Sequence, residues 1–313
     1  MQTATITAPI NLPFQLSPLT SGASHRRATL SLSRTAMSSA AAALRSAYPV
    51  TELIDESDFE PLLSPDGYIS ICGFGSLLSG AHRRNHLHFP YYYLFLLIVN
   101  LTLSFFLSAE RSARSTFPDL ANFRTARLNG FRRVFAHVAP VFFERGIANP
   151  QTMEISSLSV EPCDGETLVV TVFEITKSEI PDFIKREVEF RFLAVLPETL
   201  DGKSFDIPAV LCARYSDEEF FNIRCKGNKE IYFQQYGRWN IDKIWRDDVL
   251  PCRVYLRHCV LAAKNLGETA YNNFLEHTYL SDRKTTIREY LATTGAGIME
   301  EQPPESVRHR YEG

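Results

Sequence analysis

The stretch that decides the fold is Tyr68-Ile69-Ser70-Ile71-Cys72-Gly73-Phe74-Gly75-Ser76-Leu77-Leu78. A short apolar run stops at two glycines, which is typical of a buried strand that ends in a tight turn. Glycine allows unusual backbone dihedral angles and a close approach to a ligand, and the exposed N–H groups of such a turn can bind an anion. By itself the pattern fits a ligand-binding loop or an ordinary turn. It is not a Walker loop, because no Gly-Lys-Ser/Thr follows.

The segments after this loop carry both strand and helix patterns. Strands are expected over residues 127–138, 154–160, 167–175, 191–196 and 207–215. The turn-forming residues 161–166 predict a hairpin between two of them. Helices are expected over residues 178–190, 254–274 and 281–291, and residues 216–250 are expected to be irregular. Five or six strands with inserted and C-terminal helices predict an α+β domain built on a small mixed β-sheet or barrel.

The helix expected over residues 178–190 carries a carboxylate on its apolar face. With about 100° between successive residues, Glu187 falls in the middle of an apolar stripe, whereas Glu189 points to the opposite side. The stripe consists of Ile180, Phe183, Ile184 and Val188. A buried carboxylate is costly unless it is paired or useful, and burial raises its pKa towards the range of a general acid or base. Helical geometry alone leaves open a catalytic role and a structural ion pair.

Loop and helix together resemble the γ-glutamylcyclotransferase-like superfamily, in which a strand-ending G-[YF]-G-S-L loop precedes a glutamate on a later helix. The chain resembles a plant-type member with some ChaC-like features. The loop here is Gly73-Phe74-Gly75-Ser76-Leu77, and Phe183-Ile184-Lys185-Arg186-Glu187 is similar to the L-D-x-R-E segment of the ChaC-like branch. The resemblance covers most of residues 67–280. Phe74 stands where many members have tyrosine, Phe183-Ile184 replaces Leu-Asp, and Val188-Glu189-Phe190 replaces a glycine-rich turn.

The resemblance implies a reaction that needs no metal or cofactor. The α-amine of a γ-glutamyl amine or peptide attacks its own γ-carbonyl, which yields 5-oxoproline and the freed amine. Because the nucleophile is tethered, it needs only orientation. Glu187 would take a proton from the α-ammonium and return it to the leaving amine. Gly73, Phe74, Gly75, Ser76 and Leu77 would bind the substrate, with the loop amides holding its α-carboxylate or the developing oxyanion.

The first 51 residues differ in composition from the rest of the chain. They contain four arginines but no Lys, Asp or Glu, and 25 of them are Ser, Thr or Ala. Such a leader has the composition of an organelle transit peptide, and its Ser/Thr content favours the chloroplast stroma over the mitochondrion. A disordered tail of a cytoplasmic protein is the alternative. Residues 52–66 are expected to be an acidic linker, residues 67–292 the folded domain, and residues 293–313 a disordered tail.

An uncharged apolar run extends over residues 89–109. It is long enough to span a bilayer, but a span here would separate the ligand loop from the rest of its domain. Residues 80–109 therefore have three interpretations. Translated intron is favoured, because these residues are rich in amino acids with pyrimidine codons and their removal joins the loop to Glu110. A bulging apolar loop and a membrane span are the alternatives.

Composition and the remaining motifs limit other functions. A net charge of −3 and the lack of a basic patch disfavour nucleic acid as a partner. The six cysteines form no C-x-x-C pair, so reduced thiols are expected. His82, His86 and His88 have metal-like spacing, but a chance cluster is favoured, and His137 is expected to be a packed or solvated residue. The oligomeric state stays open. A non-catalytic protein that binds a small amine or peptide is the rival function.

Overall fold

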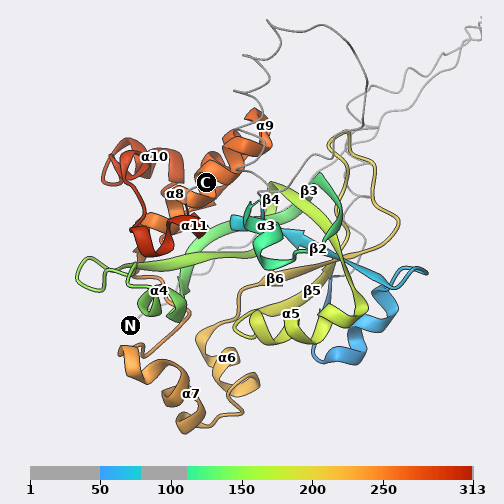
Figure 1. Cartoon of the computed structure of the whole chain (residues 1–313), viewed down its shortest axis with the longest axis horizontal. Coiled ribbons are helices and arrows are strands. Elements are labelled where there is room, and N and C mark those ends of the chain that lie inside the picture. Colours follow the sequence, from blue (N-terminus) through green and yellow to red (C-terminus); the bar gives the residue numbers. More distant parts are fainter. Residues whose placement is uncertain (1–49, 79–110, 312–313) are drawn as a thin grey trace, which may run out of the picture. The chain divides into compact units, whose positions relative to one another are not determined.

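The computed structural model describes residues 50–78 and 111–311 (Figure 1). The expected insertion at residues 80–109 lies outside the described residues, as does nearly all of the expected leader, residues 1–51. Among the described residues, no helix is both long enough and apolar enough to cross a bilayer.

Within the described residues, one mixed β-sheet forms the framework. Its strands are β1 (Thr51–Leu53), β2 (Tyr68–Gly73), β3 (Ala121–Val138), β4 (Glu154–Thr176), β5 (Arg191–Val195), β6 (Ala209–Ala213), β7 (Leu250–Pro251) and β8 (Thr278–Tyr279). They follow the order β1-β5-β6-β2-β4-β3-β8, and β7 pairs with β4. This order has two ends, so the sheet is open, and with its helices it confirms the predicted α+β class.

Strand β2 lies inside the sheet, as its apolar sequence predicts. It runs antiparallel to β4, with Cys72 opposite Val172, and parallel to β6, with Cys72 opposite Leu211. Ile71 and Cys72, which point to opposite faces of the sheet, are both buried. This explains why apolar and polar residues do not alternate at the end of the run 68–72. The chain leaves the sheet after Gly73, and the loop begins there.

The hairpin predicted at residues 161–166 does not form. Both apolar runs belong to one continuous strand, β4, which pairs along its length with β3. The register shifts between the pairs Asn129–Thr167 and Phe131–Pro162, so the turn-forming residues are accommodated as an irregularity in the ladder. The long strand β3 offers partners on both sides of this irregularity, and the chain therefore continues in one direction instead of reversing.

Short helices surround the sheet (Figure 1). With η for 3₁₀ helices, they are η1 (Glu56–Leu62), η2 (Ser76–Leu78), α3 (Arg111–Thr116), α4 (Pro140–Glu144), η3 (Lys177–Glu179), α5 (Ile180–Arg186), α6 (Asp217–Ile223), α7 (Lys229–Tyr236), η4 (Gly237–Trp239), α8 (Arg253–Leu266), α9 (Glu268–Glu276), α10 (Ile287–Ala292), η5 (Ile298–Glu300), η6 (Glu305–Val307) and α11 (Arg308–Tyr311). The helix expected over residues 254–274 is divided into α8 and α9 because Gly267 adopts φ +121° between them. The helix expected over residues 281–291 is reduced to α10.

Two segments expected to lack regular structure contain helices. In residues 216–250, Ser216 and Glu219 form a reciprocal capping box that starts α6. In residues 52–66, β1 and η1 place Phe59 in the core beneath the sheet. Each of these helices buries only one or two side chains, so neither segment shows the repeated apolar spacing by which a helix is predicted from sequence.

The C-terminal tail expected to be disordered is folded onto the domain as far as the structure describes it. Val307 and Tyr311 are buried in a cluster with Phe142 and Cys252. Figure 1 shows α11 beside α8. The expectation of a tail at residues 293–313 is therefore wrong, because a few spaced apolar residues are enough to anchor a short polar segment.

Candidate active site

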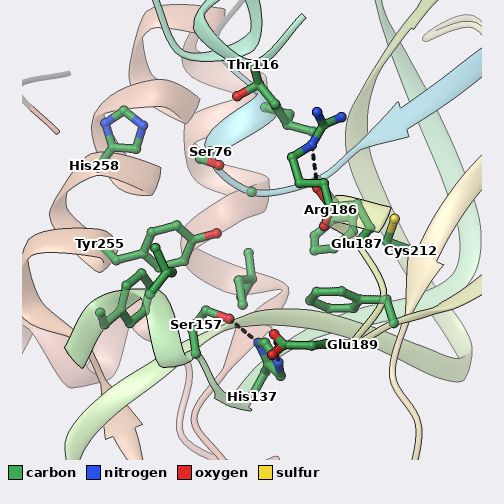
Figure 2. Close-up of a pocket in the computed structure, with 18 of the residues that line it drawn as sticks. Ser76, Thr116, His137, Ser157, Arg186, Glu187, Glu189, Cys212, Tyr255 and His258 are labelled. Atoms are coloured by element: carbon green, nitrogen blue, oxygen red, sulfur yellow. Dashed lines mark hydrogen bonds and ion pairs between the residues drawn. The ribbon is translucent and has the colours of Figure 1, made fainter. Parts of the chain in front are cut away.

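The two features singled out in the sequence line one cavity of about 550 Å³. Phe74, Gly75, Ser76 and Leu77 line it after the end of β2, and Glu187 lines it after the end of α5. Figure 2 shows Ser76 and Glu187 among the side chains around this space. The predicted residue Gly73 does not line the cavity; it is the last residue of β2, directly before the loop.

Glu187 lies at the C-terminal cap of α5 and not within a helix that continues to residue 190. The helix ends at Arg186, and Glu187 has φ −99° and ψ 24°. Because β5 starts at Arg191, the chain turns over the residues between them, and the expected apolar stripe stops. Val188 is consequently 37% exposed. Glu189, expected on the opposite side from Glu187, lines the same cavity.

The environment of Glu187 favours its protonated form. Its Oε1 lies 3.4 Å from Nε of Arg186, and its side chain is 25% exposed. Burial raises the pKa of Glu187 above its ordinary value. The positive charge of Arg186 opposes this rise, and the negative charge of Glu189 adds to it. With a net rise, Glu187 is a stronger base than an exposed glutamate, which favours a role in proton transfer.

The loop glycines are required for close packing and not for unusual dihedral angles. Neither Gly73 nor Gly75 has a positive φ, so that part of the expectation is wrong. A Cβ atom on Gly73 would lie 2.7 Å from Thr171 Oγ1 and 2.8 Å from Leu77 Cβ. A Cβ atom on Gly75 would lie 3.2 Å from the hydroxyl oxygen of Tyr255. Neighbouring side chains occupy the space that the missing Cβ atoms leave.

The loop offers backbone hydrogen-bond donors that have no partner among the described residues. In the part of the chain that the structure describes, no hydrogen bond occupies the backbone N–H of Gly75, Ser76 or Leu77. The carbonyl of Leu77 accepts a hydrogen bond of 2.9 Å from Thr171 Oγ1, which ties the loop to β4. Successive N–H groups that have no partner among the described residues, on residues that line a cavity, can bind an anion.

A buried arginine that the sequence reasoning missed holds this loop. Arg133 of β3 is fully buried, and its Nε donates a hydrogen bond of 2.7 Å to the carbonyl of Phe74. Its other nitrogens donate to the carbonyl of Val169 and to Asn273 Oδ1. Burial lowers the pKa of Arg133 to about 9. The sequence gives one signal of this role: Arg133 is a charged residue at the start of the apolar run 134–136.

A second polar group in the cavity was also missed. His137 is 2% exposed and is hydrogen-bonded to Ser157 on one ring nitrogen and paired with Glu189 on the other (Figure 2). Strand pairing places His137 opposite Ser157, and the turn after α5 brings Glu189 to them. No sequence spacing signals this arrangement, because the three residues come from separate elements.

Tyrosine and arginine side chains complete the cavity wall. Tyr255 is hydrogen-bonded to the Ser76 side chain, and burial raises the pKa of its phenol well above the ordinary value, so the phenol stays neutral. Arg145 and Arg310 also line the cavity, and Arg145 donates a hydrogen bond of 2.5 Å to the Tyr311 hydroxyl. The cavity therefore contains both carboxylates and guanidinium groups.

Within residues 50–78 and 111–311, no group of histidine, cysteine, aspartate and glutamate side chains is placed to hold a metal ion. The six cysteines are free thiols. His82, His86 and His88, which have metal-like spacing, lie outside the described residues.

No protein-family model and no curated protein matches the sequence. Among solved structures, a γ-glutamyl cyclotransferase is 17% identical, with a TM-score of 0.29 over 58% of this chain and 90% of that one. An uncharacterized protein from Homo sapiens gives the same values. A protein from Arabidopsis thaliana solved in solution is 11% identical, with a TM-score of 0.27 over 57% of this chain and 97% of that one. These values describe a distant likeness in chain path.

Proposed function

We propose that the chain is a γ-glutamylcyclotransferase-like enzyme that converts a γ-glutamyl amine or peptide into 5-oxoproline and the free amine. The observation that carries the proposal is the cavity itself. One side chain in it, Glu187, has a carboxyl group with a raised pKa, and the loop 74–77 lines the same space with backbone N–H groups that lack a partner among the described residues. These are the two groups that the cyclisation needs, a proton carrier and a site for negative charge.

Glu187 acts first as a general base. A γ-glutamyl group enters with its α-amine protonated, and a protonated amine has no lone pair for attack. The carboxylate of Glu187 removes one proton, and the amine nitrogen then attacks the γ-carbonyl carbon to close a five-membered ring. Attack within one molecule has a high effective concentration, so positioning replaces a cofactor as the main source of rate.

The loop stabilises the charge that develops on the γ-carbonyl oxygen. The N–H groups of Gly75, Ser76 and Leu77 are unpaired within the described residues, so they can donate to this oxygen or to the α-carboxylate. Arg133 fixes the carbonyl of Phe74, which keeps the loop in one conformation before substrate binds. The protonated Glu187 then gives its proton to the leaving nitrogen, and the bond between that nitrogen and the γ-carbon breaks.

The test is 5-oxoproline release by the full-length protein from a panel of γ-glutamyl amino acids, peptides and amines. Glu218→Gln is the matched control, because Glu218 is exposed on α6 and lies away from the cavity lining. Release from at least one compound, by the wild type and by this control, supports the proposal. Tight binding of a γ-glutamyl compound without release indicates the non-catalytic rival, and neither binding nor release would overturn the proposal.

The proposed site of action is the chloroplast stroma, on the basis of the leader composition. A fluorescent protein fused after residue 313 should enter chloroplasts, and removal of residues 1–51 should leave it in the cytoplasm. Import that does not depend on the leader would contradict this assignment.

A further inference from the structure

We propose that Ser157 is a nucleophile activated by His137 and Glu189, and that it gives the cavity a second activity: hydrolysis of small carboxylic esters through an acyl-serine intermediate. This proposal uses neither Glu187 nor cyclisation, so it stands or falls independently of the proposed function.

The three residues lie in contact in one row, with a hydrogen bond at the serine end and an ion-pair contact at the glutamate end. Ser157 Oγ lies 2.7 Å from His137 Nδ1, and His137 Nε2 lies 3.0 Å from Glu189 Oε2. Figure 2 shows the Ser157–His137 hydrogen bond and Glu189 beside the imidazole ring. A nucleophile within hydrogen-bond reach of a base, which is itself oriented by a third group, is the geometric signature of covalent acyl transfer.

The position of each proton follows from the partners. A lone pair on His137 Nε2 would face the negative carboxylate of Glu189 at 3.0 Å, so Nε2 carries the imidazole hydrogen, although it is not aligned for a hydrogen bond. In a neutral imidazole the other nitrogen, Nδ1, then has a lone pair. The hydroxyl of Ser157 donates to this lone pair, so its proton already points at the group that would accept it.

Aromatic rings pack around His137 and hold Ser157, His137 and Glu189 in this arrangement. The ring centroid of His137 lies 4.8 Å from that of Phe190 and 4.6 Å from that of Trp245. Glu189 is fixed further by a hydrogen bond with the hydroxyl group of Tyr236. A base that cannot rotate keeps its lone pair aimed at the nucleophile, which is the role of the third residue in such triads.

Ser157 differs from its neighbours on the same strand. Ser156 donates to the carbonyl of Leu250 at 2.8 Å, and Ser159 donates to the carbonyl of Val134 at 3.0 Å. Both hydroxyl groups therefore satisfy backbone acceptors, and neither residue lines the cavity. Ser157 lines the cavity, and its hydroxyl group is hydrogen-bonded to His137. Of these three serines, it is therefore the one that a ligand in the cavity can reach and that a base can activate.

The step balances without an added reagent other than water. Ser157 Oγ forms a bond to the ester carbonyl carbon, and its proton passes to His137 Nδ1. The carbon–oxygen bond to the alcohol breaks, and the alcohol leaves with that proton. Water then attacks the acyl-serine, gives a proton to the imidazole, and releases the carboxylic acid as Ser157 recovers its hydrogen. Ser76 and Leu77 line the same cavity, and their N–H groups, which have no partner in residues 50–78 and 111–311, are the donors offered to the oxyanion.

The experiment treats the full-length protein with a biotin-tagged alkyl fluorophosphonate, a reagent that phosphonylates activated serines with loss of fluoride. Intact mass and peptide mapping should show one adduct, on Ser157. Ser157→Ala should remove it, and His137→Gln should slow labelling by about 100-fold or more. Circular dichroism and thermal melting of each variant check that it is folded.

Ser159→Ala is the matched control, because it removes a buried hydroxyl from the same strand without touching His137. It should label as the wild type does, and so should Glu218→Gln, whose side chain is exposed on α6 away from the cavity lining. An unlabelled wild-type protein overturns the proposal. So does an adduct on another residue, or labelling of Ser157→Ala at the wild-type rate.

Discussion

Replacing Gly73 with alanine tests whether packing behind the loop shapes the cavity. The new methyl group would lie 2.7 Å from Thr171 Oγ1 and 2.8 Å from Leu77 Cβ. Neither atom can swing aside, because Leu77 Cβ is fixed to the backbone and Thr171 Oγ1 is held by its hydrogen bond to the carbonyl of Leu77. The loop backbone must therefore move.

The magnitude follows from two opposing effects. Overpacking a close-packed interior costs about 1–3 kcal/mol, and loss of glycine flexibility in the unfolded chain returns about 0.4–1 kcal/mol. The Gly73→Ala variant should therefore have a free energy of unfolding lower by about 1–2 kcal/mol. The nearest contact at Gly75 is 3.2 Å, which a shift of a few tenths of an ångström relieves, so Gly75→Ala should change stability little.

Denaturant titration and thermal melting of both variants measure the difference. A change of 1 kcal/mol shifts the melting temperature of a domain of this size by about 2–4 °C, so Gly73→Ala should melt about 2–8 °C below the wild type. Because Leu77 moves with the loop, 5-oxoproline release should also fall. Gly73→Ala as stable as the wild type, or Gly75→Ala clearly the less stable variant, would refute this explanation of the loop.

Three further substitutions probe the site. Arg133→Met leaves the carbonyls of Phe74 and Val169 without their donor, so denaturant titration should show a loss of about 2–5 kcal/mol, and unchanged stability would count against the loop-holding role. Arg186→Met removes a cation that lowers the pKa of Glu187, so the acidic limb of the pH profile of kcat/KM should move to higher pH; a limb that moves down contradicts this sign. Folding raises the pKa of Glu187, so its ionised form disfavours the folded state above that pKa. Glu187→Gln should therefore be at least as stable as the wild type at pH 7, with no advantage below about pH 4, where glutamate is protonated in both states; a clear loss of stability at pH 7 is the contrary result.

Local signals in the sequence identified the parts of the site that depend on adjacent residues. The run Tyr68–Cys72 predicts a buried strand because its apolar character reflects neighbours on both sides, and the structure places it there. The glycines mark the loop for the same local reason. The cavity brings that loop and Glu187 together, although Glu187 lies after a helix and not within it.

The remaining parts depend on pairing between distant segments. The hairpin prediction failed because residues 161–166 have turn chemistry, yet the continuous partner strand β3 keeps β4 extended. Ser157 and His137 meet only through that same pairing, and Glu189 joins them only because α5 ends at Arg186. A helical projection that continues to residue 190 places Glu189 on the wrong side, so no local pattern could reveal this group.

The most direct test of the central claim compares Glu187→Gln with Glu189→Gln for 5-oxoproline release from the best substrate of the panel. Both substitutions replace one carboxyl group of the same cavity by an amide. They differ in which carboxyl group is left to transfer the proton of the reaction. Glu187→Gln should lower kcat by about 100-fold or more while the folded state and the Kd for substrate are retained, and Glu189→Gln should keep most of the activity. Wild-type turnover by Glu187→Gln would contradict the assignment of Glu187 as the general acid and base.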